Sequence, residues 1–156
     1  MSTLILYATK NGATRDIAQR IAKNMDNATL HDLKAPPAPN LADFDCVIIG
    51  SPLYAGSIRR EARVFVSKHA DALLDKNFGL FLSGMDDRDV QSAFNSNFSA
   101  NLLEAANATA FLGGAFDPEK SGVFGRLIMK VVTKQSGYVS TINDDEIKEF
   151  AEFMKV

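Results

Sequence analysis

The chain has 156 residues, of which 46% are apolar and 23% charged, with a formal net charge of −2. These values predict one globular domain over residues 1–156. They exclude a membrane-spanning protein, because no run approaches the ~18–20 apolar residues of a span, and the charge argues against a general nucleic-acid binder. The single cysteine, Cys46, excludes an internal disulfide, and no signal peptide is recognisable, so we expect a cytoplasmic protein.

The start of the chain predicts a strand, a polar loop and a helix. Four apolar residues over 4–7 favour a short buried strand, and apolar residues at helical spacing favour a helix over 14–25. The loop between them holds Thr9, Lys10, Asn11, Gly12, Ala13 and Thr14. A helix start carries unpaired N–H groups and the positive end of the helix dipole, and Gly12 lets the backbone approach an anion. The loop therefore suits a phosphate group.

This loop differs from two common phosphate loops. No G-x-x-x-x-G-K-[ST] motif occurs, and Gly12 is the only glycine of the loop, which rules out G-x-G-x-x-G. The pattern instead resembles the flavodoxin signature, whose constrained places are filled by Ile5, Leu6, Tyr7, Thr9, Gly12, Thr14, Ala18 and Ile21. In that family the loop wraps the terminal phosphate of FMN, so the resemblance implies FMN as cofactor. The alternative is an ordinary strand–loop–helix joint with hydroxyls as helix caps.

Strands and helices alternate along the rest of the chain. A short edge strand is predicted at 28–33, followed by a proline-rich surface connection at 35–39 and by a turn or a vestigial helix at 41–45. Further strands are predicted at 46–50, at 78–82 and within 108–116, and further helices at 60–75, 88–106, 122–135 and 144–155. Asn143 is the expected N-cap of the last helix.

This alternation predicts an α/β protein with an open parallel sheet between helices. The run CVIIG over 46–50 is typical of a strand covered on both faces. The resemblance to flavodoxins implies a three-layer αβα flavodoxin-like fold with a five-stranded parallel sheet in the order 2-1-3-4-5. In that order the ligand lies beyond the carboxyl ends of the strands, between strands 1 and 3.

The loop after the third strand offers groups that suit a flavin ring. It contributes Pro52, Leu53, Tyr54, Ala55 and Gly56. Tyr54 or Leu53 can cover a ring face, and Ala55 and Gly56 are small enough for the backbone to approach the ring edge. In flavodoxins, which this loop resembles, a peptide here flips when the flavin is reduced. The alternative is a Pro–Gly turn with a surface tyrosine.

The loop after the fourth strand is predicted to meet the pyrimidine end of the ring. It contributes Ser83, Gly84, Met85 and Asp86. Backbone N–H groups would bind the ring, Met85 would pack on it, and Asp86 with Asp87 would disfavour an anionic reduced flavin. These carboxylates also suit the start of the helix predicted at 88. No metal site and no nucleophile–base pair is recognised, as expected where a cofactor carries the chemistry.

Two features depart from the strongly acidic electron-carrier flavodoxins. Arg59 and Arg60 follow the second loop, so we expect charges of mixed sign around the cofactor. Residues 53–70 and 117–138 resemble the menaquinone-dependent protoporphyrinogen oxidase branch of the family. Residues 107–116 run straight through, so the long insertion of that branch is expected to be absent. At 113–114, Gly-Gly predicts a bulge, a turn or a close approach.

The helix predicted at 122–135 carries a basic stripe of Arg126, Lys130 and Lys134. It is either a solvated edge or a surface attracted to anionic lipid or to porphyrin propionates, which would allow peripheral membrane contact.

Taken together, these features predict an FMN-binding redox protein that exchanges electrons with partner proteins. The alternative is an FMN-dependent enzyme that oxidises a porphyrinogen and passes the electrons to a quinone or another acceptor. A receiver-like signalling module shares the sheet order but needs acidic residues after strand 1, and residues 7–10 offer none.

Overall fold

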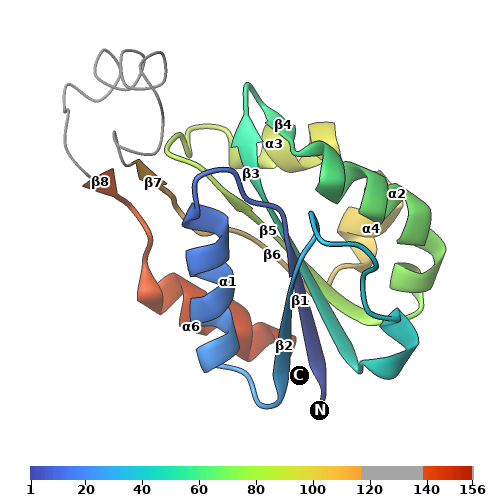
Figure 1. Ribbon diagram of the computed structural model, residues 1–156. Helices are drawn as coiled ribbons and strands as arrows, with labels where there is room; N and C mark the ends of the chain where they lie inside the picture. Colours follow the sequence, from blue (N-terminus) through green and yellow to red (C-terminus); the bar gives the residue numbers. More distant parts are fainter. Residues whose placement is uncertain (117–138, 156) are drawn as a thin grey trace.

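The structure, a computed structural model, describes residues 1–116 and 139–155. A parallel sheet lies between two layers of helices (Figure 1). Its parallel strands are β1 (Thr3–Tyr7), β2 (Ala28–Asp32), β3 (Cys46–Tyr54), β5 (Asn77–Ser83) and β6 (Ala108–Phe111). Their order is β2-β1-β3-β5-β6. This confirms the predicted three-layer α/β fold, the order 2-1-3-4-5 and the edge position of the second strand.

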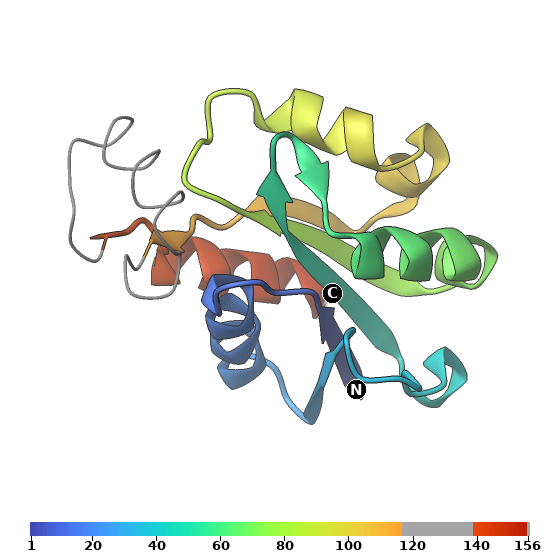
Figure 2. The ribbon, with the colours of Figure 1, turned by 45° about the horizontal axis from the view of Figure 1, so that its top comes forward.

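Alternate side chains of the strands enter two separate cores. The helices are α1 (Ala13–Lys23), α2 (Arg60–Leu74), α3 (Val90–Asn97), α4 (Ala100–Ala105) and α6 (Asp144–Met154). Leu4 and Leu6 face the core under α2, α3 and α4, whereas Ile5 and Tyr7 face the core under α1 and α6. Figure 2 shows the two helical layers on opposite sides of the sheet. Because both faces are covered, the central strands are almost wholly apolar.

The connection between β2 and β3 replaces a full helix by one turn. Residues Leu41–Asp43 form a 3₁₀ turn, η1, whose N-cap Asn40 accepts a hydrogen bond from the Ala42 N–H at 3.1 Å. The sequence predicts either a turn or a vestigial helix at 41–45. The structure has the vestigial helix, in the form of this single 3₁₀ turn.

The single helix predicted at 88–106 is wrong, because the chain is extended in its middle. Helix α3 ends at Asn97, and both Phe98 and Ser99 have extended backbones. The Ser99 hydroxyl accepts a hydrogen bond from the Leu102 N–H at 3.3 Å and so caps the start of α4. A strong capping residue thus divides one apolar pattern into two helices.

The strand predicted within 108–116 occupies only the first part of that segment. Strand β6 ends at Phe111, and Gly113 has a φ of 82°, a left-handed conformation that interrupts a strand. The next strand, β7 (Ala115–Phe116), pairs antiparallel with β8 (Val139–Ser140) instead of continuing the main sheet. The chain therefore leaves the sheet between β6 and α6. The predicted helix 122–135, with its basic stripe, lies outside the described residues.

The third strand is longer than predicted. It continues beyond Gly50 because Ser51 and Pro52 extend the parallel pairing with β5, opposite Leu82 and Ser83. Its last two residues pair antiparallel with β4 (Ser57–Ile58). Part of the predicted second loop is therefore strand, and the loop itself is the tip of a hairpin.

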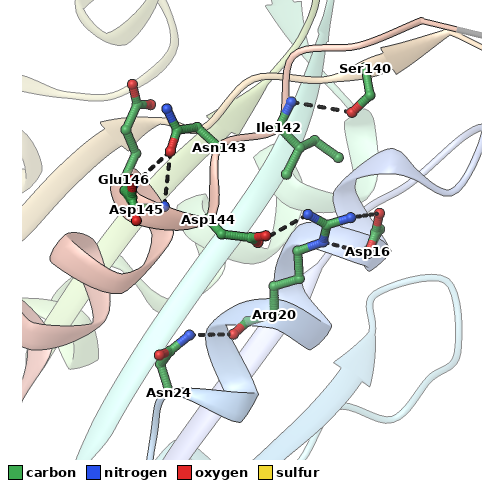
Figure 3. Close-up of polar contacts among 9 residues, drawn as sticks. All are labelled: Asp16, Arg20, Asn24, Ser140, Ile142, Asn143, Asp144, Asp145 and Glu146. Atoms are coloured by element: carbon green, nitrogen blue, oxygen red, sulfur yellow. Dashed lines mark hydrogen bonds and ion pairs between the residues drawn. The ribbon is translucent and has the colours of Figure 1, made fainter.

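Helix α1 is tied to α6 by the Arg20 guanidinium (Figure 3). Arg20 donates to both carboxylate oxygens of Asp16, at 3.0 and 3.1 Å, and to Asp144 at 3.0 Å. The hydrogen bonds to Asp16 and Asp144 raise the pKa of Arg20. Asn143 accepts hydrogen bonds from the Asp145 and Glu146 N–H groups, which confirms it as the N-cap of α6. These contacts fix the helix that begins at the predicted phosphate loop.

Both ends of the described chain lie at the amino-end edge of the sheet, near one another and opposite the loops that follow β1, β3 and β5 (Figure 1). Among the described residues, no helix combines the length and the apolar character that crossing a lipid bilayer requires.

Candidate functional site

Three loops follow the carboxyl ends of three adjacent strands, β1, β3 and β5. Side-chain contacts join them. The Thr14 and Ser83 hydroxyls lie 2.8 Å apart, and the Asn11 amide donates to the Tyr54 hydroxyl at 3.4 Å. The structure therefore brings the three predicted segments together at the edge of the sheet where ligands bind in folds of this kind.

The first loop leaves the start of α1 open to an anion. Gly12 is the N-cap of α1 with a φ of 94°, and no side chain caps the helix. The Gly12 N–H donates to the Thr9 hydroxyl at 3.0 Å, which shapes the loop without covering the helix start. The Lys10 side chain adds a nearby cation. Hydroxyl capping, the alternative explanation of the motif, does not occur here, and the donor set fits a phosphate.

Thr14 has a structural contact that the sequence did not reveal. Its side chain is buried, and its hydroxyl meets that of Ser83 at the end of β5. Two residues predicted on different loops thus contact each other directly. The pair fixes the start of α1 against the sheet, so Thr14 positions the loop as well as lying within it.

Of the two residues predicted to cover a ring face, Tyr54 is the more exposed. Leu53 is half-buried and packs against the core under α2, whereas Tyr54 is 42% exposed. The Lys10 ammonium lies 4.9 Å from the centre of the Tyr54 ring, a cation–π contact between the first two loops. Partial burial raises the pKa of Tyr54, although Arg59 opposes the shift.

The tip of the β3–β4 hairpin is a two-residue turn. Ala55 and Gly56 have φ values of 50° and 80°, and Tyr54 pairs with Ser57 across them. Positive φ at both central residues defines a type I′ turn. Of the alternative explanation, a Pro–Gly turn with a surface tyrosine, the turn is wrong because Pro52 is part of β3, whereas the tyrosine is at the surface. Ala55 is strained, since a left-handed backbone costs a residue with a Cβ about 1–2 kcal/mol.

We expect Ala55→Asn to raise the free energy of unfolding by about 0.5–1 kcal/mol. Asparagine tolerates the left-handed conformation, and Asn-Gly is the preferred pair in type I′ turns. Urea unfolding followed by circular dichroism measures the change. Ala55→Val is the matched comparison and is expected to destabilise the protein, because a β-branched residue fits this conformation poorly. Equal stability of the two variants would contradict the assigned turn.

The third loop is packed against the segment after β6. The Gly84 N–H donates to the Gly113 carbonyl at 3.0 Å, and a Cβ on Gly114 would lie 2.7 Å from the Gly84 carbonyl oxygen. The glycine pair at 113–114 therefore serves a close approach of two backbones. Because the Gly84 N–H is already used, the backbone donors left for a ligand in this loop belong to Met85 and Asp86.

Two charged groups at the second and third loops are paired with close neighbours. Asp86 accepts from the Arg88 guanidinium at 2.9 and 2.8 Å, and hydrogen bonds from Arg88 lower the pKa of Asp86 to about 2. Arg59 donates to Glu61 at 2.9 Å. Asp86 thus presents a charge that a cation already balances, which weakens its predicted effect on a nearby anion.

Arg88→Gln is expected to raise the pKa of Asp86 towards its ordinary value of 3.8. In the wild type the low folded-state pKa stabilises the protein at pH values above the unfolded pKa, and this contribution is lost as the pH falls towards 2. The Arg88→Gln variant should lose this contribution to stability. An NMR titration of the Asp86 carboxyl carbon measures the shift, and an unchanged midpoint would show that Arg88 does not hold the carboxylate in solution.

Sequence reasoning missed two residues that support the hairpin. The Asn97 side chain hydrogen-bonds to Gly56 and Ile58, and the Ser51 hydroxyl accepts from the Arg59 N–H at 3.0 Å. Asn97 gave no local signal, because its partners lie about 40 positions earlier in the chain. In the described part of the chain, no three His, Cys, Asp or Glu side chains gather as ligands for a metal ion.

A separate groove of about 960 Å³ runs between the proline-rich connection and α2. Apolar residues such as Val64 and Phe65 line it. Its charged lining residues are the cations Arg60, Lys68 and Lys76 and the carboxylates Glu61 and Asp75. None of the residues predicted for the FMN site lines this groove. One of its lining residues, Arg60, directly follows Arg59, whose N–H donates to Ser51 at the base of the hairpin.

The pattern of the flavodoxin domain family matches residues 4–142. The chain belongs to that family. A curated relative, the protoporphyrinogen IX dehydrogenase [quinone] of Escherichia coli strain K12, is 26% identical over 150 residues, which cover 88% of this chain and 81% of the relative.

Solved flavodoxins have the same fold as this member of the family. The Streptococcus pneumoniae TIGR4 flavodoxin aligns with a TM-score of 0.61 and 15% identity over 99% of this chain and 98% of its own. Oxidised flavodoxin 2 of Bacillus cereus aligns with a TM-score of 0.60 and 19% identity, over 99% of this chain and 98% of its own. A Lactobacillus acidophilus flavoprotein solved with FMN aligns with a TM-score of 0.52 and 15% identity, over 70% of this chain and 92% of its own. At these identities the likeness establishes the fold.

Proposed function

We propose that this flavodoxin-family protein binds FMN and transfers electrons through it to redox partner proteins, with the whole chain acting as a single domain. The observation that carries the proposal is the convergence of three loops beside the uncapped start of α1. Family membership supports FMN as the group that lies there. The single cysteine supports a cytoplasmic location, because no internal disulfide requires an oxidising compartment.

The residues divide into a phosphate end and a ring end. Residues 9–14 would hold the phosphate through backbone N–H groups at the start of α1, with Lys10 adding positive charge. Tyr54 would cover one face of the ring, and residues 83–86 would bind its edge. Bound FMN supplies one- and two-electron redox chemistry. The protein's part is to hold the ring, limit its contact with water and set its reduction potentials.

Stepwise anaerobic reduction of the purified protein, followed by visible absorbance, tests this function. We expect flavin bands at the start and a separate long-wavelength band at partial reduction, as one-electron transfer requires. Direct passage to the fully reduced spectrum would favour two-electron enzyme chemistry. A colourless protein that does not take up added FMN would overturn the proposal.

A second candidate is FMN-dependent oxidation of a porphyrinogen with a quinone as acceptor. The groove along α2 favours it, because its walls are largely apolar and its three cations outnumber its two carboxylates. Such a lining suits a large apolar molecule that carries carboxylates. The similarity to the E. coli dehydrogenase supports the same substrate class. Attraction to anionic lipid through residues 122–135 remains a prediction from the sequence.

The second candidate predicts turnover of protoporphyrinogen by the FMN-loaded protein with a soluble quinone. Lys68→Glu should raise KM at least about tenfold, because it places a negative charge where a substrate carboxylate would bind. Lys23→Glu, the same charge reversal on α1, is the matched control and should leave KM unchanged. No turnover above free FMN would remove this candidate and leave the electron carrier.

A further inference from the structure

One side chain of α3 holds the tip of the β3–β4 hairpin. Asn97, the last residue of α3, donates from its amide nitrogen to the Gly56 carbonyl at 2.9 Å and to the Ala93 carbonyl at 2.7 Å. Its amide oxygen accepts from the Ile58 N–H at 3.0 Å. Both amide hydrogens and the oxygen are therefore used, and the contact to Ala93 fixes the side chain to its own helix.

These bonds join the turn of the hairpin and the strand that follows it to one side chain. Gly56 is a central residue of the turn, with a φ of 80°, and Ile58 is the second residue of β4. The Asn97 carboxamide donates to the carbonyl of the first and accepts from the N–H of the second. Asn97 thus holds both the turn and β4 against the end of α3.

The hairpin needs such support because its own pairing is short. Strand β4 has two residues, which pair only with Leu53 and Tyr54. The turn also contains Ala55 in a strained left-handed conformation. Strained backbone persists only where surrounding contacts determine it. Ser51 holds the base of the hairpin through the Arg59 N–H, and Asn97 holds the tip.

We propose that Asn97 is a positioning residue that fixes the hairpin over the flavin ring and couples it to α3. Helix α3 follows the 83–86 segment, and Asp89 caps its start by accepting from the Ser92 N–H at 3.2 Å. One carboxamide therefore connects the hairpin to the helix that follows the 83–86 segment. This inference rests on the proposed FMN function, and it assigns no role to Asn97 at the phosphate.

Amide hydrogen exchange in the flavin-free protein tests the contact itself. In Asn97→Ala, the Ile58 N–H should exchange at least about tenfold faster than in the wild type, because its acceptor is gone. Asn95→Ala, the same truncation on the exposed side of α3, is the matched control and should leave Ile58 unchanged. An unchanged Ile58 rate in Asn97→Ala would overturn the proposal, and this measurement stands even if FMN does not bind.

The role of Asn97 in flavin binding is tested by comparing the affinity for FMN with the affinity for inorganic phosphate, which represents only the phosphate end of FMN. Asn97→Ala should weaken FMN binding at least about fivefold while leaving the binding of inorganic phosphate, followed by the Gly12 amide shift, within about twofold. Failure of the wild type to bind FMN would count against the proposed function alone. Equal losses for both ligands, or no loss for FMN, would overturn the positioning role.

Asn97→Asp separates the two halves of the contact. At neutral pH its carboxylate still accepts from Ile58 but cannot donate to Gly56, so FMN binding should be weakened. As the pH falls through the pKa of the new carboxyl group, the protonated form regains a donor and FMN affinity should recover relative to the wild type at the same pH. Absence of recovery would contradict the hydrogen bond that is assigned to the Gly56 carbonyl.

Discussion

Replacing Gly12 by valine together with Thr14 by alanine is expected to weaken FMN binding by at least about a hundredfold, which corresponds to about 3 kcal/mol. Gly12 has a φ of 94°, a conformation that a β-branched residue adopts only under strain. The loop would therefore rearrange and turn its N–H groups away from the phosphate. Loss of the Thr14 hydroxyl also removes the contact that fixes α1 to Ser83. Fluorescence titration of the flavin-free protein with FMN measures the effect.

Two controls separate a lost site from a lost fold. Circular dichroism should show that the double variant retains the secondary structure of the wild type, because a Cβ at Gly12 would meet no atom within 4 Å. Thr14→Ser keeps the hydroxyl that reaches Ser83 and should bind FMN within about threefold of the wild type. A double variant that purifies yellow and fully loaded would show that the phosphate site lies elsewhere.

Gly50→Ala is expected to lower the free energy of unfolding by about 3 kcal/mol. A methyl group on Gly50, in the centre of β3, would overlap the end of the Phe81 ring on the neighbouring strand β5. Phe81 has no exposed surface and packs edge-on against Phe150, so the ring cannot move aside freely. For a chain of this size, the melting temperature should fall by about 10 °C.

The companion substitution Phe81→Leu tests the cause. Leucine leaves room where the ring lay, so the double variant Gly50→Ala/Phe81→Leu should be more stable than the sum of the two single effects predicts, by about 1 kcal/mol or more. Chemical unfolding of all four proteins gives this coupling energy. Strict additivity would mean that the Phe81 ring does not fill the space over Gly50.

Those parts of the fold that depend on local pattern could be predicted from the sequence. The apolar run that begins at Cys46 identified a strand covered on both faces, and Asn143 identified the start of the last helix. The end of β3 could not be predicted, because Pro52 is typical of a turn and only its neighbour on β5 shows that the pairing continues. Likewise, the cap at Ser99 is decisive only once the backbone before it is seen to be extended.

For the candidate site, the sequence located the loops but not the contacts between them. Gly12 marked the candidate phosphate loop through its motif. For the glycine pair at 113–114, a close approach of two backbones was one of three predicted alternatives, and the structure has it. The partners that decide these details are distant in sequence: Gly84 for Gly114, Ser83 for Thr14, and Gly56 for Asn97. Such pairs leave no periodic trace, since each depends on how separate strands and helices are placed in space.

The position of the two chain ends has a practical consequence for joining this protein to another molecule. Both ends lie at the amino-end edge of the sheet, whereas the candidate FMN loops lie at the opposite edge (Figure 1). A fusion partner, an affinity tag or a surface linker attached at either end would start on the far side of the domain from the loops. In a tethered or fused protein, electron donors and acceptors would therefore reach the flavin from the side that faces away from the attached group.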